Sequence, residues 1–372
     1  MSLAENRRIA LALSGGGIRA MAFHLGVLKL LAERDLLEEI QRVSTVSGGS
    51  LLIGLLLKEN GMQWPSSHAF LYSAYQELRE KLCKRSLQWG AARQLLNPAN
   101  WRFFLSRANL LGLALRREWN IDCALSDLPS TPEWSINGTT AENGKRFRFK
   151  RDNLGDYTLG YAAGGNFPLA DALAVSAAFP GGFGPLRIDT TKFDWRKRPW
   201  DAPSGSEKST NIGFDVLHLY DGGVYDNLGL EPFFDSGKCD TKCPENYIIV
   251  SDAGSPLPNG FSFRELNPRR LKRIADIMAD QAHALRVRSF ANFLQQGPNR
   301  GAFFFINTPT DGPDSSTSFA CEFPTTLRKL TLGEFDRLAD HGYKVALQVE
   351  KQYGLCKRMP GEELTAQDCP AR

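Results

Sequence analysis

Three consecutive glycines, Gly15, Gly16 and Gly17, separate a short apolar run from a stretch with helical periodicity. Glycine loses more backbone entropy on folding than any other residue, so a triplet indicates a tight turn or a close approach to the backbone. Residues 8–13 predict a buried strand, and apolar side chains recur at near-helical spacing through residues 17–37. The triplet therefore predicts a strand, a sharp turn and a helix whose first N–H groups are bare.

The same pattern follows once more along the chain. Residues 40–47 predict a second short strand, and residues 48–61 predict a second helix after another glycine pair. Strand, glycine turn and helix repeated in this order are typical of a parallel sheet covered by helices. We therefore expect residues 1–372 to form one α/β domain, a three-layer α/β/α fold with a mostly parallel central sheet.

Later segments add an insertion and further strands. Residues 62–125 are helical in pattern, aromatic and basic, and we expect a helical cap inserted into the domain. A hairpin is expected across Asn143-Gly144, and residues 189–213 predict a surface loop. The sequence also predicts a helix over 168–186 broken at Pro180, and strands ending at two acids, Asp221 and Asp252, of which we expect Asp252 to cap a helix.

Composition excludes several classes of protein. The net charge of +4 is too small to indicate nucleic-acid binding, and no nucleic-acid motif is present. Apolar runs are too short to span a bilayer, and no signal peptide is recognised, so we expect a cytoplasmic protein. The seven cysteines are scattered, which argues against a disulfide framework. Cys239 and Cys243 lack partners for a tetrahedral metal site, so no metal is expected.

One serine and one acid stand where chemistry is expected. Ser47, in "TVSGG", lies on the predicted strand-to-helix bend and resembles a nucleophile elbow, although Thr45 stands where glycine is usual. A serine hydroxyl needs a base. His24 and His218 fall inside predicted elements and are interpreted as packing residues. Asp221 ends a strand, where α/β sheets keep their active sites, and is the better candidate.

The ordered motifs "GGGIR", "VSGGS", "SAAFP" and "DGGVYDN" resemble those of the patatin-like phospholipase family, over residues 8–230. The resemblance implies a Ser–Asp dyad of Ser47 and Asp221 that hydrolyses lipid acyl esters through an acyl-enzyme, without a cofactor. It also implies an oxyanion hole at Gly15, Gly16, Gly17 and Arg19. Residues expected to support the site are Gly49, Gly222, Gly223 and Pro180.

Several alternatives stay open from the sequence. Gly15, Gly17 and Ala20 also fit a dinucleotide-binding fingerprint, but the next strand ends in Ser47 rather than in an acid. A non-catalytic lipid-binding protein on the same fold is the third class. Arg19 either favours the oxyanion or pairs on the surface. The basic, aromatic insertion at 62–125 either contacts an anionic membrane or packs on the core.

Overall fold

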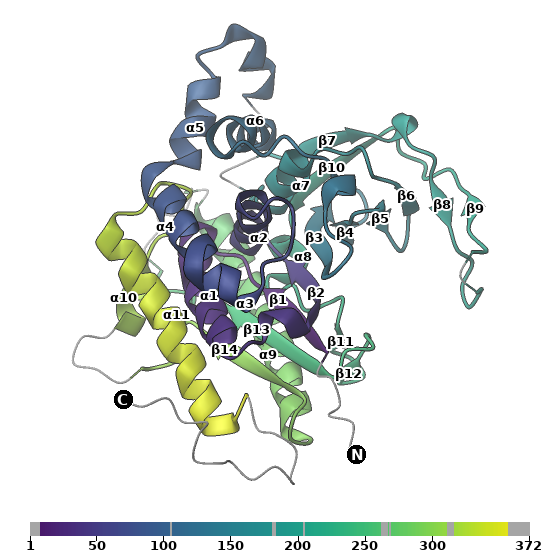
Figure 1. Ribbon diagram of the computed structural model, residues 1–372. Coiled ribbons are helices and arrows are strands. Elements are labelled where there is room, and N and C mark those ends of the chain that lie inside the picture. The colour runs from purple at the N-terminus through teal and green to yellow at the C-terminus, as the bar shows by residue number, and fades with distance from the viewer. Residues whose placement is uncertain are drawn as a thin grey trace.

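The computed structural model describes residues 8–104, 106–180, 184–203, 205–261, 267, 269–310 and 316–355. Helices cover both faces of a central sheet, which gives three layers (Figure 1). The expected α/β/α architecture is confirmed. No helix among the described residues is long and apolar enough to cross a membrane.

The centre of the sheet is parallel, as expected. Its strands run in the spatial order β14 (Gly301–Phe305), β13 (Tyr247–Asp252), β1 (Ile9–Leu13), β2 (Ile40–Thr45) and β3 (Glu133–Thr140). β1 and β13 are buried along their whole length, because both faces of the sheet are covered here. This burial explains why both strands read as continuous apolar runs rather than as alternating patterns.

Beyond β3 the sheet is antiparallel: β3 and β4 form the hairpin predicted across Asn143-Gly144, whereas the antiparallel strands that follow were not predicted. The strands are β4 (Arg146–Phe149), β5 (Asn153–Asp156), β6 (Gly160–Ala163), β8 (Arg196–Lys197) and β9 (Lys208–Ser209). Segment 189–213, expected to be a loop, thus contributes two short strands and a 3₁₀ turn, Thr190–Lys192. A separate ribbon pairs β11 (Phe234–Asp235) with β12 (Asp240–Thr241).

One antiparallel strand meets a parallel strand end to end. β10 (Val216–Asp221) pairs with β7 (Leu186–Asp189) and with the last residues of β3. Gly138 of β3 pairs with Phe147 of β4 on one edge and with Asp221 on the other. β2 pairs with the same edge of β3 as β10 does, but with earlier residues of β3. This pairing ends with Thr45 opposite Ile136. β2 and β10 therefore approach each other with their carboxyl ends.

The helices divide between the two faces of the sheet. On one face lie α1 (Gly17–Glu33), α2 (Gly48–Glu59), α7 (Leu169–Ser176) and α11 (Leu332–Tyr353), which share a core with Leu11 and Leu13. On the other face α9 (Arg269–Gln295) packs against Ala10 and Ala12, through Phe290 and Phe293. The short helices α8 (Gly223–Asp226) and α10 (Ser316–Glu322) complete the set.

Segment 62–125 contains α3 (Ser67–Ala69), a π-helical turn (Phe70–Ala74), α4 (Tyr75–Lys84), α5 (Leu87–Gln94) and α6 (Arg107–Trp119). In Figure 1, α5 and α6 lie at the top, whereas α3 and α4 lie beside α1. The segment therefore projects from the domain only in part. Its apolar side chains divide by position: Leu111 and Trp119 are buried in the main core, whereas Trp89 and Trp101 are more than 60% exposed. Part of this segment is therefore core and part is surface.

Candidate active site

Ser47 occupies a strained backbone position between β2 and α2. Its φ and ψ are 49° and −117°, a conformation that costs a non-glycine residue free energy and is often found at functional sites. The turn is tight because Gly49 lies against β1, where a side chain at Gly49 would approach the Leu13 carbonyl to 2.6 Å. A glycine is therefore required at this position of the bend.

Thr45, the departure from the usual elbow, is held by hydrogen bonds. Its hydroxyl accepts from Trp134 Nε1 at 2.9 Å and lies 2.7 Å from Ser50 Oγ. Ser50 Oγ in turn lies 2.8 Å from Ser176 Oγ, and all three hydroxyls are buried. Because each buried hydroxyl has a partner, a β-branched residue at 45 is accommodated without an unsatisfied polar group.

Asp221 lies beside Ser47, across the meeting point of β2 and β10. Ser47 is close enough for its side chain to stabilise the ionised carboxyl of Asp221, and Gly223 N–H donates to Asp221 Oδ1 at 2.7 Å. Asp221 is 2% exposed, and burial raises the pKa of its carboxyl to about 7. The structure thus brings the predicted nucleophile and base together. In a parallel sheet they would meet because the carboxyl ends of neighbouring strands share one edge. Here β10 is antiparallel to β3, and its carboxyl end meets that of β2 from the opposite direction.

The backbone of the "SAAFP" segment accepts hydrogen bonds from both Ser47 and Asp221. Ser47 N–H donates to the Ser176 carbonyl at 3.1 Å and to Ser176 Oγ at 3.0 Å. Asp221 N–H donates to the Ala178 carbonyl at 3.1 Å. α7 ends at Ser176 rather than at Pro180, so our prediction of the helix end is wrong: these carbonyls bind Ser47 and Asp221 instead of continuing the helix. Pro180 itself is exposed.

The glycine triplet lies against the elbow, and its three members differ. A side chain at Gly15 would reach 3.0 Å from Ser47 Cβ, but Gly15 N–H already donates to the Asn227 carbonyl at 3.1 Å. Gly16 N–H and Gly17 N–H have no acceptor among the described residues, and they stand at the start of α1. Gly16 and Gly17, rather than Gly15, are therefore available to an anion.

Arg19 faces away from the elbow and into the protein. Its guanidinium donates to the Ala253 carbonyl at 3.0 and 3.2 Å and to the Phe323 carbonyl at 2.6 Å. Burial lowers the pKa of Arg19 to about 10, so the side chain stays charged near neutral pH. Its contacts are structural: it ties the first turn of α1 to the segments that follow β13 and α10.

Two further glycines and one amide shape the Asp221 turn. A side chain at Gly222 would approach the Asn137 carbonyl to 2.5 Å, and one at Gly223 would approach Asn227 Oδ1 to 2.8 Å. The same Asn227 oxygen would be 2.4 Å from a side chain at Gly15. Asn227 therefore fills the space between the glycine triplet and the Asp221 turn, and small residues on both sides permit it.

The histidines serve other contacts. His24 is buried, bonded to Ser251 Oγ at 2.7 Å and to the Ser14 carbonyl at 3.0 Å, and burial lowers its pKa to about 4. His218 pairs with Glu142 at 2.7 Å. Among the described residues, no histidine bonds the Asp221 carboxylate. A histidine-based triad is therefore not what this arrangement presents.

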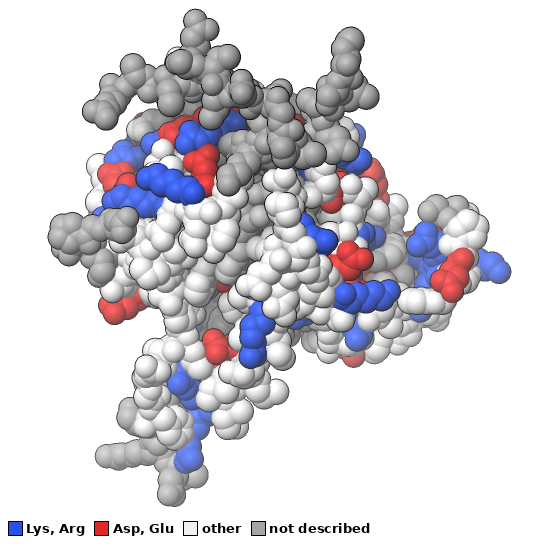
Figure 2. All heavy atoms as spheres, turned by 90° about the horizontal axis from the view of Figure 1, so that it is seen from below, with Lys and Arg blue, Asp and Glu red and all other residues white. Residues whose placement is uncertain are grey.

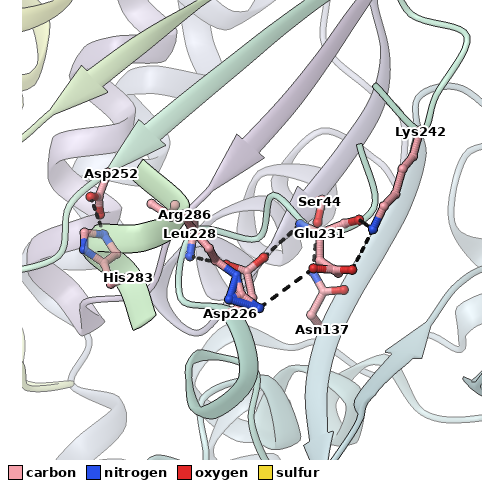
Figure 3. Close-up of polar contacts among 9 residues, drawn as sticks. All are labelled: Ser44, Asn137, Asp226, Leu228, Glu231, Lys242, Asp252, His283 and Arg286. Carbon is pink, nitrogen blue, oxygen red and sulfur yellow. Dashed lines mark hydrogen bonds and ion pairs between the residues drawn. The ribbon is translucent and has the colours of Figure 1, made fainter. Parts of the chain in front are cut away.

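A second acid at a strand end binds a histidine. Figure 3 shows Asp252 joined to His283 of α9, at 2.8 Å, and Asp226 facing Arg286 of the same helix. Asp252 also accepts from Gly254 N–H at 2.9 Å, and no described helix starts there, so our prediction of a helix cap is wrong. These two acids anchor α9 to the sheet.

No group of metal-binding side chains is found among the described residues. Searching them for three or more His, Cys, Asp or Glu at ligand spacing finds none. Cys239 and Cys243 are free thiols, the second of them buried, whereas Cys356 and Cys369 lie outside the described residues. The arrangement at Ser47 thus consists of a hydroxyl, a buried carboxyl and two bare amides.

A family model for patatin-like phospholipase matches residues 11–234. This range covers more than half of the chain and contains both Ser47 and Asp221. The chain belongs to the patatin-like phospholipase family. No curated protein sequence matches the chain.

Solved structures share the fold at low sequence identity. Human GIVD cytosolic phospholipase A2 aligns with a TM-score of 0.55 and 14% identity, covering 94% of this chain and 59% of that one. The same human protein in complex with methyl gamma-linolenyl fluorophosphonate gives a TM-score of 0.52, 14% identity and coverages of 95% and 58%. VipD from Legionella pneumophila is a weaker match, with a TM-score of 0.40, 15% identity and coverages of 94% and 67%. The chain spans less than two thirds of the human neighbour.

Sequence reasoning missed two residues at this site, Ser176 and Thr139. Ser176 holds the elbow, and Thr139 Oγ1 donates to the Asp221 carbonyl at 2.9 Å. Asn227 was expected to hold the turn at Asp221, and the structure adds that it fills the space between the two turns. Ser176 and Asn227 stand inside the quoted motifs, so the motifs carried the signal, whereas Thr139 lies in a strand that no motif marked. Only their contacts show what these residues do.

Proposed function

We propose that this chain hydrolyses carboxylic esters of phospholipids or lysophospholipids through a Ser47–Asp221 dyad. The observation that supports it most is the Ser47 side chain beside the buried carboxyl of Asp221, whose pKa burial raises to about 7. A carboxylate with an ordinary pKa is too weak a base for a serine hydroxyl. A raised pKa brings the acid closer to the range in which general bases work near neutral pH.

The reaction follows from the geometry in two halves. Ser47 Oγ attacks the ester carbonyl while its proton passes to Asp221, and the carbonyl oxygen becomes an oxyanion facing Gly16 N–H and Gly17 N–H. The carbon–oxygen bond to the alcohol then breaks, and the proton on Asp221 goes to the leaving oxygen. Water next gives a proton to Asp221 and attacks the acyl-enzyme, which releases the fatty acid and restores Ser47. Each preorganised donor contributes roughly 3–4 kcal/mol to lowering the barrier.

Arg19 has a positioning role in this proposal. Its charge is satisfied by two backbone carbonyls, so it stabilises the loop that presents the glycine amides rather than binding the oxyanion itself. Asn227 and Ser176 act in the same way, on the turn and on the elbow. Among the described residues, the groups assigned to the reacting atoms are Ser47, Asp221 and the amides of Gly16 and Gly17.

The direct test combines labelling with turnover. A lipid-like fluorophosphonate should label Ser47, identified by peptide mass, and Ser47→Ala should abolish both labelling and hydrolysis across a panel of phospholipid and lysophospholipid esters. Ser73→Ala, a serine exposed on the π-helical turn, serves as the matched control and should behave as wild type. Labelling elsewhere, or full turnover by Ser47→Ala, contradicts the proposal.

Two further variants separate the competing interpretations. Asp221→Asn should lose hydrolysis, and if it remains active, His218 is the next base to test. If wild type binds lipid vesicles but neither reacts with the fluorophosphonate nor releases fatty acid, the non-catalytic lipid-binding interpretation is correct. The panel also shows whether phospholipids or lysophospholipids are preferred.

Contact with a lipid surface is assigned in this proposal to the insertion at 62–125. Its outer surface carries Trp89, Trp101 and Phe104, each more than half exposed, among the exposed cations Arg93, Arg102 and Arg107. Apolar and basic side chains together suit an anionic membrane. Trp89→Ser with Trp101→Ser should weaken co-sedimentation with anionic vesicles, whereas Trp200→Ser, at a 91% exposed position elsewhere, should not. Equal loss in both variants would contradict this assignment.

A further inference from the structure

A small cavity rich in cations lies in the sheet, at β2, β3 and β4. Its volume is about 90 Å³, and its lining includes four cations but one carboxylate, namely Arg42, Arg146, Arg148, Lys150 and Glu133. Side chains alternate between the faces of a strand, so Arg146 and Arg148 of β4 share one face with Lys150 just after it. The cavity therefore concentrates positive charge on one face of the sheet.

The acids near this cavity do not balance its cations. Lys150 pairs with Glu133, and Arg42 pairs with Glu245 at 3.3 Å. Arg146 donates to the neutral Asn137 Oδ1 at 2.9 Å. Among the described residues, neither Arg146 nor Arg148 lies within ion-pair distance of a carboxylate. Neither guanidinium therefore has a directly paired carboxylate, and the charges of Glu231 and Asp226 act on Arg146 from beyond ion-pair distance.

Arg148 leaves a donor unused inside the protein. Its Nε is buried and has no hydrogen-bond partner among the described residues, and its guanidinium lies 4.1 Å from the centre of the Tyr161 ring. A buried donor without an acceptor costs free energy, so native proteins rarely retain one without a reason. Stacking on Tyr161 fixes the plane of the guanidinium. This arrangement favours a ligand that accepts hydrogen bonds.

The neighbouring cations also repel one another. Burial, followed by the charge of Arg148, lowers the pKa of Arg146. The same two causes lower the pKa of Lys150, in spite of its pairing with Glu133. Like charges held together in a partly enclosed space gain most from a multivalent anion. This repulsion agrees with the arrangement of the cavity, in which four cations line one small space.

We infer that the cavity binds a small oxyanion of the phosphate class, either as a free ion or as a phosphomonoester headgroup. Guanidinium forks match the oxygens of a tetrahedral oxyanion, and a double negative charge would balance Arg146 and Arg148 together. The volume admits such an ion together with few other atoms. The inference concerns binding alone and does not depend on ester hydrolysis at Ser47.

The site is connected to the nucleophile strand through one side chain. Asn137, which accepts from Arg146, donates to the Thr45 carbonyl and to Ser44 Oγ, both at 2.9 Å. Figure 3 shows Ser44 and Asn137 bonded to each other on neighbouring strands. An anion that orders Arg146 would therefore also stabilise β2 and β3, so ligand binding should raise the melting temperature of the whole domain.

The test measures binding of inorganic phosphate to the full chain. Calorimetry at constant ionic strength, with chloride as the comparison ion, should give saturable binding of one phosphate and a melting temperature that rises with phosphate concentration. Arg148→Gln should weaken binding by about ten-fold or more, because it removes a charged donor. Arg148→Lys should give an intermediate affinity. Arg151→Gln, at a nearby exposed cation outside the lining, should bind as wild type does.

Separate arms distinguish the source of the phosphate and the two sites. Glycerol 3-phosphate in solution and vesicles containing phosphatidate are compared with inorganic phosphate, and tighter binding to the vesicles identifies a lipid headgroup. Ser47→Ala should bind phosphate as wild type does, whatever its hydrolytic activity. If wild type shows no saturable binding, or if Arg148→Gln and Arg151→Gln lose affinity equally, the inference is overturned. Circular dichroism of each variant shows whether it is folded.

Discussion

Ser176 holds Ser47 by two acceptors at once, because its carbonyl and its hydroxyl both lie within hydrogen-bond distance of Ser47 N–H, at 3.1 and 3.0 Å. The hydroxyl belongs to the buried chain that runs through Ser50 and Thr45 to Trp134. The strained backbone at Ser47 is thus supported by a side chain from another part of the sequence, which suits a residue that must stay in one conformation.

Ser176→Ala should lower turnover more than substrate affinity. The variant keeps the carbonyl but loses the hydroxyl, and it leaves Ser50 with one partner fewer. A buried hydrogen bond contributes about 1 kcal/mol, so unfolding free energy should fall by about 1–2 kcal/mol and kcat by roughly ten-fold, with KM nearly unchanged. Steady-state kinetics and urea unfolding measure both, and Ser73→Ala is the control. A change in KM alone would show that Ser176 shapes binding instead.

Activity should rise with pH through about pH 7. Asp221 must be ionised to accept the Ser47 proton, and burial raises its pKa to about 7. The pH profile of kcat/KM should therefore have an acidic limb with its midpoint near 7 and a plateau above it. A midpoint near 4 would mean that Asp221 keeps an ordinary pKa or is not the base.

The same carboxyl should make stability depend on pH. Its folded-state pKa of about 7 exceeds the ordinary value of 3.8 for aspartate, so between these pH values the folded state binds a proton that the unfolded state releases. This contribution is fully present below pH 4 and is lost as pH rises to 7, by roughly 4 kcal/mol. The Asp221→Asn variant has no carboxyl to ionise at this position, so it does not lose this stability as pH rises. The difference in unfolding free energy, variant minus wild type, should therefore increase from pH 4 to pH 8. A constant difference across this range would contradict the prediction.

Two glycines with the same backbone conformation should respond differently to alanine. Gly17 and Gly61 have φ of 61° and 63°, but a side chain at Gly17 would lie 2.6 Å from the Thr326 carbonyl, whereas one at Gly61 meets nothing within 4 Å. Gly61→Ala should cost about 1 kcal/mol in stability and leave activity intact. Gly17→Ala should displace the N–H groups at the start of α1 and lower kcat by about 10²-fold. Equal activity in both variants would show that these amides do not act on the reaction.

The pair of Asp252 and His283 should stabilise the fold most below neutral pH. Burial opposes the charged imidazole, but the bond to Asp252 raises the pKa of His283 above its ordinary value. The contribution is fully present below about pH 6.5 and is lost as pH rises through the folded-state pKa. His283→Gln should therefore destabilise the protein more at pH 6 than at pH 9, by on the order of 1 kcal/mol. His68→Gln, at an exposed position, should show no such difference.

The centre of the fold was predictable because its signals are local. Apolar runs at β1 and β2, each followed by glycines and a helical pattern, specify strand, turn and helix within a few residues of one another. The same signals placed Ser47 on its bend. Figure 2 agrees with the low net charge: over the described part of the face seen from below, basic and acidic side chains are intermixed on a largely uncharged surface.

The remainder depends on pairings between distant segments, which no local pattern encodes. β10 reads as a strand ending in an acid, but its direction is set by its partners β3 and β7. α7 ends early because its carbonyls bind Ser47 and Asp221, and Gly15 N–H is taken by Asn227. Asp221 was named from its position at a strand end and from resemblance to a family, whereas the phosphate-class cavity required the side chains of three strands to be seen together.

The meeting of β2 and β10 has a consequence during synthesis. Ser47 leaves the ribosome early, on strands and helices that can assemble at once, but its partner acid arrives only after β3, α7 and β7 have been made and β10 has closed on β3. Until then the hydroxyl has no base. A nascent or partly assembled chain is in this respect a dormant precursor, and the proposed dyad forms only in molecules whose sheet is complete.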